Sequence, residues 1–169
     1  MGTPAGGSQE GEETSAAEAP AGIGKNLYGT QMNAEKSDFK YQELTEKIIG
    51  IFYAVYNRPG YEFLEKVYEN AMMIELKKEN IPALAQAPIK VIYDDEVIGE
   101  YYADILVDNK IIVELKAARN LSGENEAQLL NYLKATGIEV GLLLNFGARP
   151  ELKRKVFDNS RKGQSDFSA

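Results

Sequence analysis

The sequence contains no cysteine and no histidine. Without cysteine there is no disulfide framework, no thiolate catalysis and no cysteine-ligated zinc. The absence of histidine excludes a Ser-His-Asp triad, an imidazole general base and every histidine-ligated metal centre. Chemistry at a polar site must therefore come from carboxylates, Lys, Tyr, Gln or a hard cation held by oxygen atoms.

Long apolar runs are also lacking. No segment reaches the roughly 18 apolar residues of a membrane span, and the N-terminus has neither the basic start nor the apolar core of a secretory signal. We therefore expect a soluble, cytoplasmic protein that does not contact a membrane. The net charge of −7 argues against a nonspecific nucleic-acid coat protein, although it says little about a local groove.

The 169 residues leave room for one domain with a tail. In the first 24 residues, Ile23 is the only branched aliphatic side chain, so this stretch cannot bury enough surface to offset its conformational entropy. We expect a disordered acidic tail over 1–40, a folded domain over 41–158 and a frayed C-terminal tail over 159–169.

Hydrophobic periodicity predicts the elements of that domain. Helices are expected over 41–56, 62–79 and 124–136, and strands over 89–93, 97–107, 111–116 and 140–146. Pro82 and Pro88 are expected to bracket a connection, and residues 151–157 could form a short edge strand or a terminal helix. The order ααβββαβ, with one more short element, predicts an α/β (α+β) fold in which helices pack on a mixed central sheet.

Two acidic residues and a lysine stand on the hairpin over 103–116, whose loop length decides which side chains share a face. A two-residue loop would set Asp104 opposite Val113 and point Glu114 away. A three-residue loop pairs Asp104 with Glu114 and gathers both with Lys116 on one face. We favour the second register because it separates polarity better and places Asn109 at a left-handed turn position. Its apolar face would be Ala103, Ile105, Val107, Ile111, Val113 and Leu115.

Opposed carboxylates repel each other and destabilise a sheet unless something neutralises them. Lys116 offsets part of the repulsion between Asp104 and Glu114. A divalent cation does so better, because Mg²⁺ binds one or two carboxylates and keeps waters and a substrate phosphate as its other ligands. The alternative is that these three side chains only solubilise an edge strand and form a solvated ion pair.

An Asp on one strand and Glu-x-Lys on the next resembles the signature of the PD-(D/E)xK nuclease superfamily. Asp104 and the Glu-Leu-Lys of 114–116 match it, with Ala103 where a Pro often stands. Residues 128–132 contain Gln and Tyr four positions apart and resemble the QxxxY motif of RecB-like members.

Two further segments are similar to the GxxExxY branch of this superfamily, namely residues 63–71 and the Asn-Phe-Gly of 145–147. The similarity departs at Glu62, which occupies the position of the branch glycine, while Gly60 stands two residues earlier. The resemblance covers roughly residues 41–157 and implies a restriction-endonuclease-like αβββαβ core.

The resemblance also implies roles at a metal site. Asp104 and Glu114 would coordinate Mg²⁺ or Mn²⁺, with the main-chain carbonyl of Leu115 as a neutral third ligand. Lys116 would position the attacking water or stabilise the phosphate. Glu65 resembles the helix-borne acid of the family, although a solvated helix residue is the alternative.

Substrate contacts are expected from several further side chains. Gln128 would anchor a water or a phosphate near the metal, and Tyr132 would touch the substrate backbone, although packing roles are the alternative for both. Arg119, Lys153 and Lys155 are candidate phosphate contacts, the two lysines sharing one strand face and Arg154 taking the other.

The sequence therefore predicts a Mg²⁺- or Mn²⁺-dependent nuclease that hydrolyses phosphodiester bonds of nucleic acid, with DNA favoured over RNA. The alternative is a non-catalytic module that binds nucleic acid or protein on a nuclease-like scaffold. Both interpretations are compatible with a homodimer.

Overall fold

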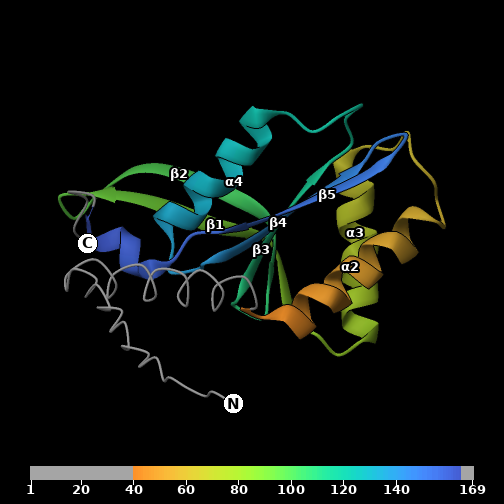
Figure 1. Ribbon diagram of the computed structural model, residues 1–169, viewed down its shortest axis with the longest axis horizontal. Coiled ribbons are helices and arrows are strands. Elements are labelled where there is room, and N and C mark those ends of the chain that lie inside the picture. Colours follow the sequence, from red (N-terminus) through yellow and green to blue (C-terminus); the bar gives the residue numbers. More distant parts are fainter. Residues whose placement is uncertain (1–39, 165–169) are drawn as a thin grey trace, which may run out of the picture. The chain divides into compact units, whose positions relative to one another are not determined.

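The computed structural model describes residues 40–164, apart from the side chains of residues 161, 163 and 164. Two helices, α2 (Gln42–Tyr56) and α3 (Glu65–Lys78), come first. They are followed by β1 (Ala83–Tyr93), β2 (Glu96–Val107), β3 (Ile111–Lys116), α4 (Gly123–Ala135), β4 (Val140–Phe146), β5 (Pro150–Val156) and a 3-10 helix, η1 (Asn159–Gln164) (Figure 1). The predicted element order and fold class are confirmed. The tail expected over residues 1–40 lies, up to residue 39, outside the described residues, as do residues 165–169.

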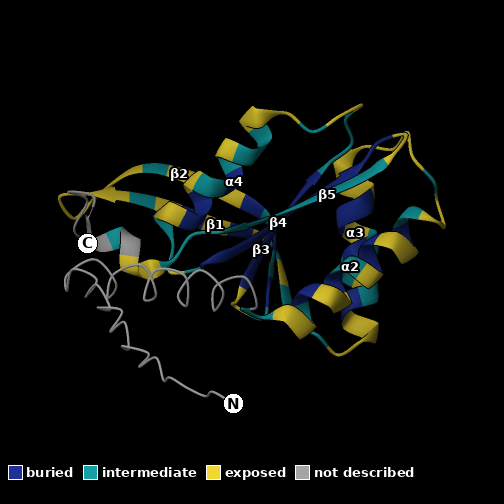
Figure 2. Ribbon diagram, in the orientation of Figure 1, coloured by how far each residue is buried: buried dark blue, intermediate teal, exposed yellow. Residues whose placement is uncertain are grey.

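Within the described residues the strands form one five-stranded sheet in the order β1-β2-β3-β4-β5. Neighbouring strands are antiparallel except β3 and β4, which are parallel, so α4 serves as the crossover that a parallel pair requires. β3 and β4 are the most buried strands, and every residue of β4 is buried (Figure 2). This agrees with the near-continuous apolar run from which the strand was predicted.

Helices cover both faces of the sheet. One apolar cluster packs α2 and α3 against β3, β4 and the inner end of β2, while a second lies under α4 (Figure 1). Alternate residues of β3 divide between them, because Val113 belongs to the first cluster and Ile112 to the second. Within residues 40–164, none of the helices combines the length and the apolar character needed to cross a bilayer.

Several element bounds differ from the predicted ones. Residues 83–88 belong to β1, so the predicted connection between Pro82 and Pro88 is wrong. β1 is an edge strand, where a residue without an N–H group is tolerated. Helix α3 begins at Glu65 and not at Glu62, whose φ of 85° is incompatible with an α-helix. The segment 150–156 is a strand, which resolves the alternative between strand and helix.

The hairpin between β2 and β3 has the predicted three-residue loop. Val107 pairs with Ile111, and Asn109 has the expected left-handed backbone with a φ of 52°. One residue of the predicted apolar face is misplaced, because Ala103 packs in the cluster under α4. The change of side coincides with Gln86 on the paired strand, whose φ of 52° departs from strand geometry.

Candidate active site

The two predicted carboxylates lie opposite each other where the β2–β3 ladder ends. The last regular pair is Ile105 with Val113. Beyond it, the N–H of Leu115 donates to Asp104 Oδ2 at 2.7 Å, and the N–H of Asp104 donates to Glu114 Oε1 at 3.2 Å. Side chains therefore take the place of the next backbone hydrogen bonds.

Burial destabilises the ionised forms of Asp104 and Glu114. The Glu114 side chain is 2% exposed. Desolvation, and secondly the charge of Asp104, raise the pKa of Glu114 to about 8, although Lys116 opposes the shift. Burial also raises the pKa of Asp104, against the hydrogen bond from Leu115. Without a counter-ion, these carboxyls therefore retain protons more strongly than exposed ones do.

Lys116 links the carboxylates to α4. Its Nζ donates to Gln128 Oε1 at 3.2 Å and lies 3.8 Å from Glu114 Oε2. Gln128 Nε2 in turn donates to the Tyr132 hydroxyl at 2.8 Å. The two helix residues are one turn apart, which brings them to the same face. The structure thus brings Lys116, Gln128 and Tyr132 together beside the carboxylate pair, and burial raises the pKa of the Tyr132 hydroxyl.

Helix α3 contributes two glutamates with different positions. The predicted Glu65 is exposed, and its Oε1 accepts a hydrogen bond from the N–H of Ala117, directly after Lys116. Glu69, one turn further, is only 3% exposed. Its charge helps to raise the pKa of Asp104. The sequence interpretation missed Glu69; its spacing of four from Glu65 on one helix face was the available signal.

The loop after Lys116 is held by residues that the sequence interpretation gave no role. Asn145 is fully buried; its Oδ1 accepts from the N–H of Ala118 and its Nδ2 donates to the carbonyl of Ala118, both at 2.9 Å. Glu151 Oε1 accepts from the N–H of Leu121 at 3.3 Å. A Cβ on Gly147 would lie 2.0 Å from the Ala118 oxygen. The Asn-Phe-Gly segment therefore holds this loop in place through the hydrogen bonds of Asn145 and the close approach of Gly147 to Ala118.

The predicted phosphate contacts lie apart from the carboxylates. Lys153 and Lys155 share a strand face and both form ion pairs with Glu126 of α4, which lower the pKa of Glu126 to about 2. The register sets Lys153 two strands from Glu114, about 10 Å across the sheet. Arg119 is exposed in the loop after β3.

Arg154 takes the other face, as predicted, and donates to the carbonyl of Lys40 at 2.8 Å.

The oxygen atoms at this site are ligands that suit a hard divalent cation. Among residues 40–164 there is no group of three or more His, Cys, Asp or Glu side chains able to hold a metal ion. Two carboxylates and the carbonyl of Leu115 suit a hard cation that retains waters or phosphate oxygens, as Mg²⁺ and Mn²⁺ do. The set does not suit zinc, which favours nitrogen and sulfur ligands.

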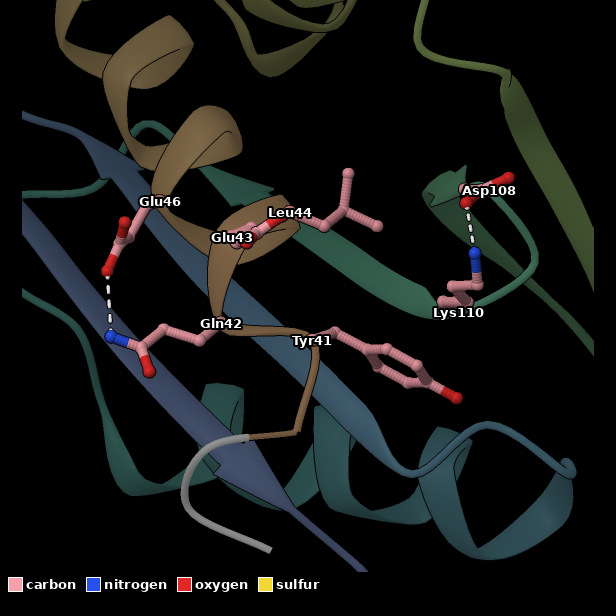
Figure 3. A pocket seen from close by; sticks show the side chains of 7 residues that line it. All are labelled: Tyr41, Gln42, Glu43, Leu44, Glu46, Asp108 and Lys110. Carbon is pink, nitrogen blue, oxygen red and sulfur yellow. Dashed lines mark hydrogen bonds and ion pairs between the residues drawn. The ribbon is translucent and has the colours of Figure 1, made fainter.

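A separate hollow lies near the beginning of the described chain (Figure 3). It is next to the β2–β3 loop, where Lys110 pairs with Asp108, and so at the opposite end of β3 from Lys116. The hollow contains no residue of the carboxylate site. Its lining residues are Tyr41, Gln42, Glu43, Leu44, Glu46, Asp108 and Lys110.

The fold and the site together define a restriction-endonuclease-like scaffold. The sheet is mixed, and an Asp and a Glu-x-Lys stand where the β2–β3 ladder ends. A glutamine of the next helix contacts the lysine. The family model of the PD-(D/E)XK nuclease superfamily matches residues 42–156, and the chain belongs to this superfamily.

Two solved structures are similar in fold. The crystal structure of SSO0001 has a TM-score of 0.43 and 21% identity, with 58% of this chain and 54% of that chain covered. An alkaline exonuclease (LHK-Exo) from Laribacter hongkongensis has a TM-score of 0.44 and 10% identity, with 59% of each chain covered. The chain thus spans a little over half the length of these proteins. A comparison with curated proteins gives no match.

Proposed function

We propose that this protein is a metal-dependent nuclease that hydrolyses phosphodiester bonds of nucleic acid, with DNA favoured over RNA. The observation that carries the proposal is the adjacency of Asp104 and Glu114, with the Lys116 ammonium between Glu114 and Gln128. Membership of the superfamily supports the same reaction class.

We assign different roles to the residues of this site. Asp104, Glu114 and the Leu115 carbonyl would hold Mg²⁺ or Mn²⁺, which supplies positive charge that activates water and offsets charge on the phosphate. The Lys116 side chain is 20% exposed, so its ammonium can reach a phosphate oxygen or a water while Gln128 holds it in place. The Tyr132 hydroxyl accepts from Gln128 on the same side, but Tyr132 is only 6% exposed and packs in the cluster under α4. Its contact with the substrate backbone therefore stays a prediction.

We further propose that the chain falls within the GxxExxY branch and uses its QxxxY pair as RecB-like nucleases do. The hydrogen bond between Gln128 and Tyr132 supports the second point. The left-handed backbone of Glu62 supports the first, because the branch has a glycine there and glycine favours this conformation.

The test is cleavage of labelled single- and double-stranded DNA and RNA with Mg²⁺ or Mn²⁺. Lys116→Ala should reduce the rate about 10²- to 10³-fold, the range for loss of one preorganised charge-stabilising group. Lys47→Ala, which removes an exposed lysine of α2, is the matched control and should leave the rate unchanged. Equal rates for the unaltered protein and Lys116→Ala would show that a contaminant cleaves the substrate.

A second candidate function is a non-catalytic binding module. The pairing of Lys153 and Lys155 with Glu126 favours it, because two predicted phosphate contacts are already neutralised. Calorimetry with Mn²⁺ separates the candidates. A nuclease site should take up Mn²⁺ and lose that uptake in Glu114→Gln, which keeps an oxygen acceptor for the N–H of Asp104, whereas a degenerate module should take up none.

A further inference from the structure

Gln86 has an unusual backbone for a residue inside a strand. Its φ is 52°, although its neighbours Ala85 and Ala87 pair regularly with β2. Left-handed backbone is unfavourable for a long side chain and persists where surrounding contacts require it. The side chain of Gln86 is exposed, so burial of apolar surface does not explain the conformation.

The contacts of the Gln86 amide provide an explanation. Its Nε2 donates to Glu69 Oε2 at 2.5 Å. The other oxygen of Glu69 accepts from Lys66 on the same helix. The pairing of Ala85 with Ile105 and of Ala87 with Ala103 sets Gln86 opposite Asp104 on β2. The Gln86 amide lowers the pKa of that carboxyl, whereas the charge of Glu69 raises it. One neutral amide therefore acts on two acids from different elements, α3 and β2.

We propose that Gln86 is a positioning residue of the carboxylate site. Its left-handed backbone directs the amide between Glu69 and Asp104, and the amide fixes the orientation of the Asp104 carboxyl toward the cation. The inference rests on the proposed metal site and adds a residue to it. A glutamine suits this position because its amide can donate to both acids without adding charge.

The experiment measures Mn²⁺ affinity by calorimetry in two variants of Gln86. Gln86→Gly removes the amide and leaves a residue that accepts the left-handed backbone, so the variant should fold. Gln86→Asn also accepts this backbone but shortens the reach of the amide. Both should weaken Mn²⁺ binding about 10- to 100-fold, as loss of an outer-shell partner does.

Asn80→Gly is the matched control. Asn80 is exposed in the turn after α3 and has a φ of 55°, so it tests the backbone change away from the site. Affinities are compared well below the unfolding transition, where a variant that is merely less stable keeps the unaltered dissociation constant. Asn80→Gly should bind Mn²⁺ as the unaltered chain does.

The outcomes are distinct. Unaltered Mn²⁺ affinity in Gln86→Gly and Gln86→Asn would overturn the positioning role and leave the proposed nuclease site standing. An equal loss of affinity in Asn80→Gly would overturn it too, by making the effect one of backbone alone. No Mn²⁺ uptake by the unaltered chain would overturn the metal site and this role with it.

Discussion

Replacing Glu114 by glutamine should stabilise the metal-free protein at neutral and alkaline pH while abolishing Mn²⁺ uptake. Burial and the charge of Asp104 raise the pKa of Glu114 from 4.5 to about 8. A carboxyl whose pKa is higher in the folded state stabilises that state fully below its unfolded pKa. This contribution is lost as the pH rises through the folded value. Stability should therefore fall between about pH 4.5 and pH 8.

The size of the effect follows from the shift. Each pKa unit corresponds to 1.36 kcal/mol, so a change from 4.5 to about 8 sets a ceiling of about 5 kcal/mol for the fall. A glutamine keeps an oxygen that can accept from the N–H of Asp104 and carries no charge. The free energy of unfolding of Glu114→Gln should therefore exceed that of the unaltered protein by a few kcal/mol above pH 8.

The assay is urea unfolding with a chelator present, from about pH 5 to about pH 9. The unaltered protein should lose stability across this range, whereas Glu114→Gln should give a flatter curve. Glu126→Gln is a control of opposite sign, because ion pairs lower the pKa of Glu126 to about 2. Its stabilising contribution is present above pH 4.5 and is lost only as the pH falls through about 2. Parallel curves for the unaltered protein and Glu114→Gln would refute the reasoning.

Three further substitutions test the packing that supports the site, each measured as the free energy of unfolding in urea. Asn145→Ala should lower the free energy of unfolding by about 2–3 kcal/mol, because it leaves the N–H and carbonyl of Ala118 without their partner. A loss no larger than that of an ordinary surface substitution would contradict the role of Asn145 in holding the loop after Lys116. Gly147→Ala should cost about 3 kcal/mol, and more than Gly141→Ala, because its Cβ meets a backbone oxygen whereas that of Gly141 meets a movable leucine side chain. Glu62→Gly should stabilise the protein by about 0.5–1 kcal/mol through relief of its left-handed backbone, and a loss of stability would count against that strain.

The carboxylate pair could be predicted because side-chain alternation in a hairpin leaves few choices. Once the loop over 108–110 was chosen for its separation of polarity, Asp104 had to face Glu114. The proximity of Lys116 to Glu114 followed from the same alternation along the strand. The place of Gln128 near the site was expected only from the family resemblance, and its hydrogen bond with Lys116 was not predicted.

Contacts between distant elements could not be predicted in this way. Glu69 and Gln86 meet because α3 packs beside β1, and periodicity within either element does not reveal that approach. The pairing of Lys153 with Glu126 is similar, because the strand pattern gives the face of the lysine but not the neighbour that covers it. Pro88 misled the assignment of β1, since proline ends central strands and is tolerated at an edge.

The reciprocal bonds of Asp104 and Glu114 also have a consequence for how variants should be designed. Each of these carboxylates fastens one strand to its neighbour through a main-chain N–H. Truncation to alanine would remove both the charge and the hydrogen bond between β2 and β3. Asp104→Asn and Glu114→Gln keep an oxygen acceptor for these main-chain N–H groups and remove only the charge. Amide replacements therefore separate ion binding from the mechanical joining of β2 to β3.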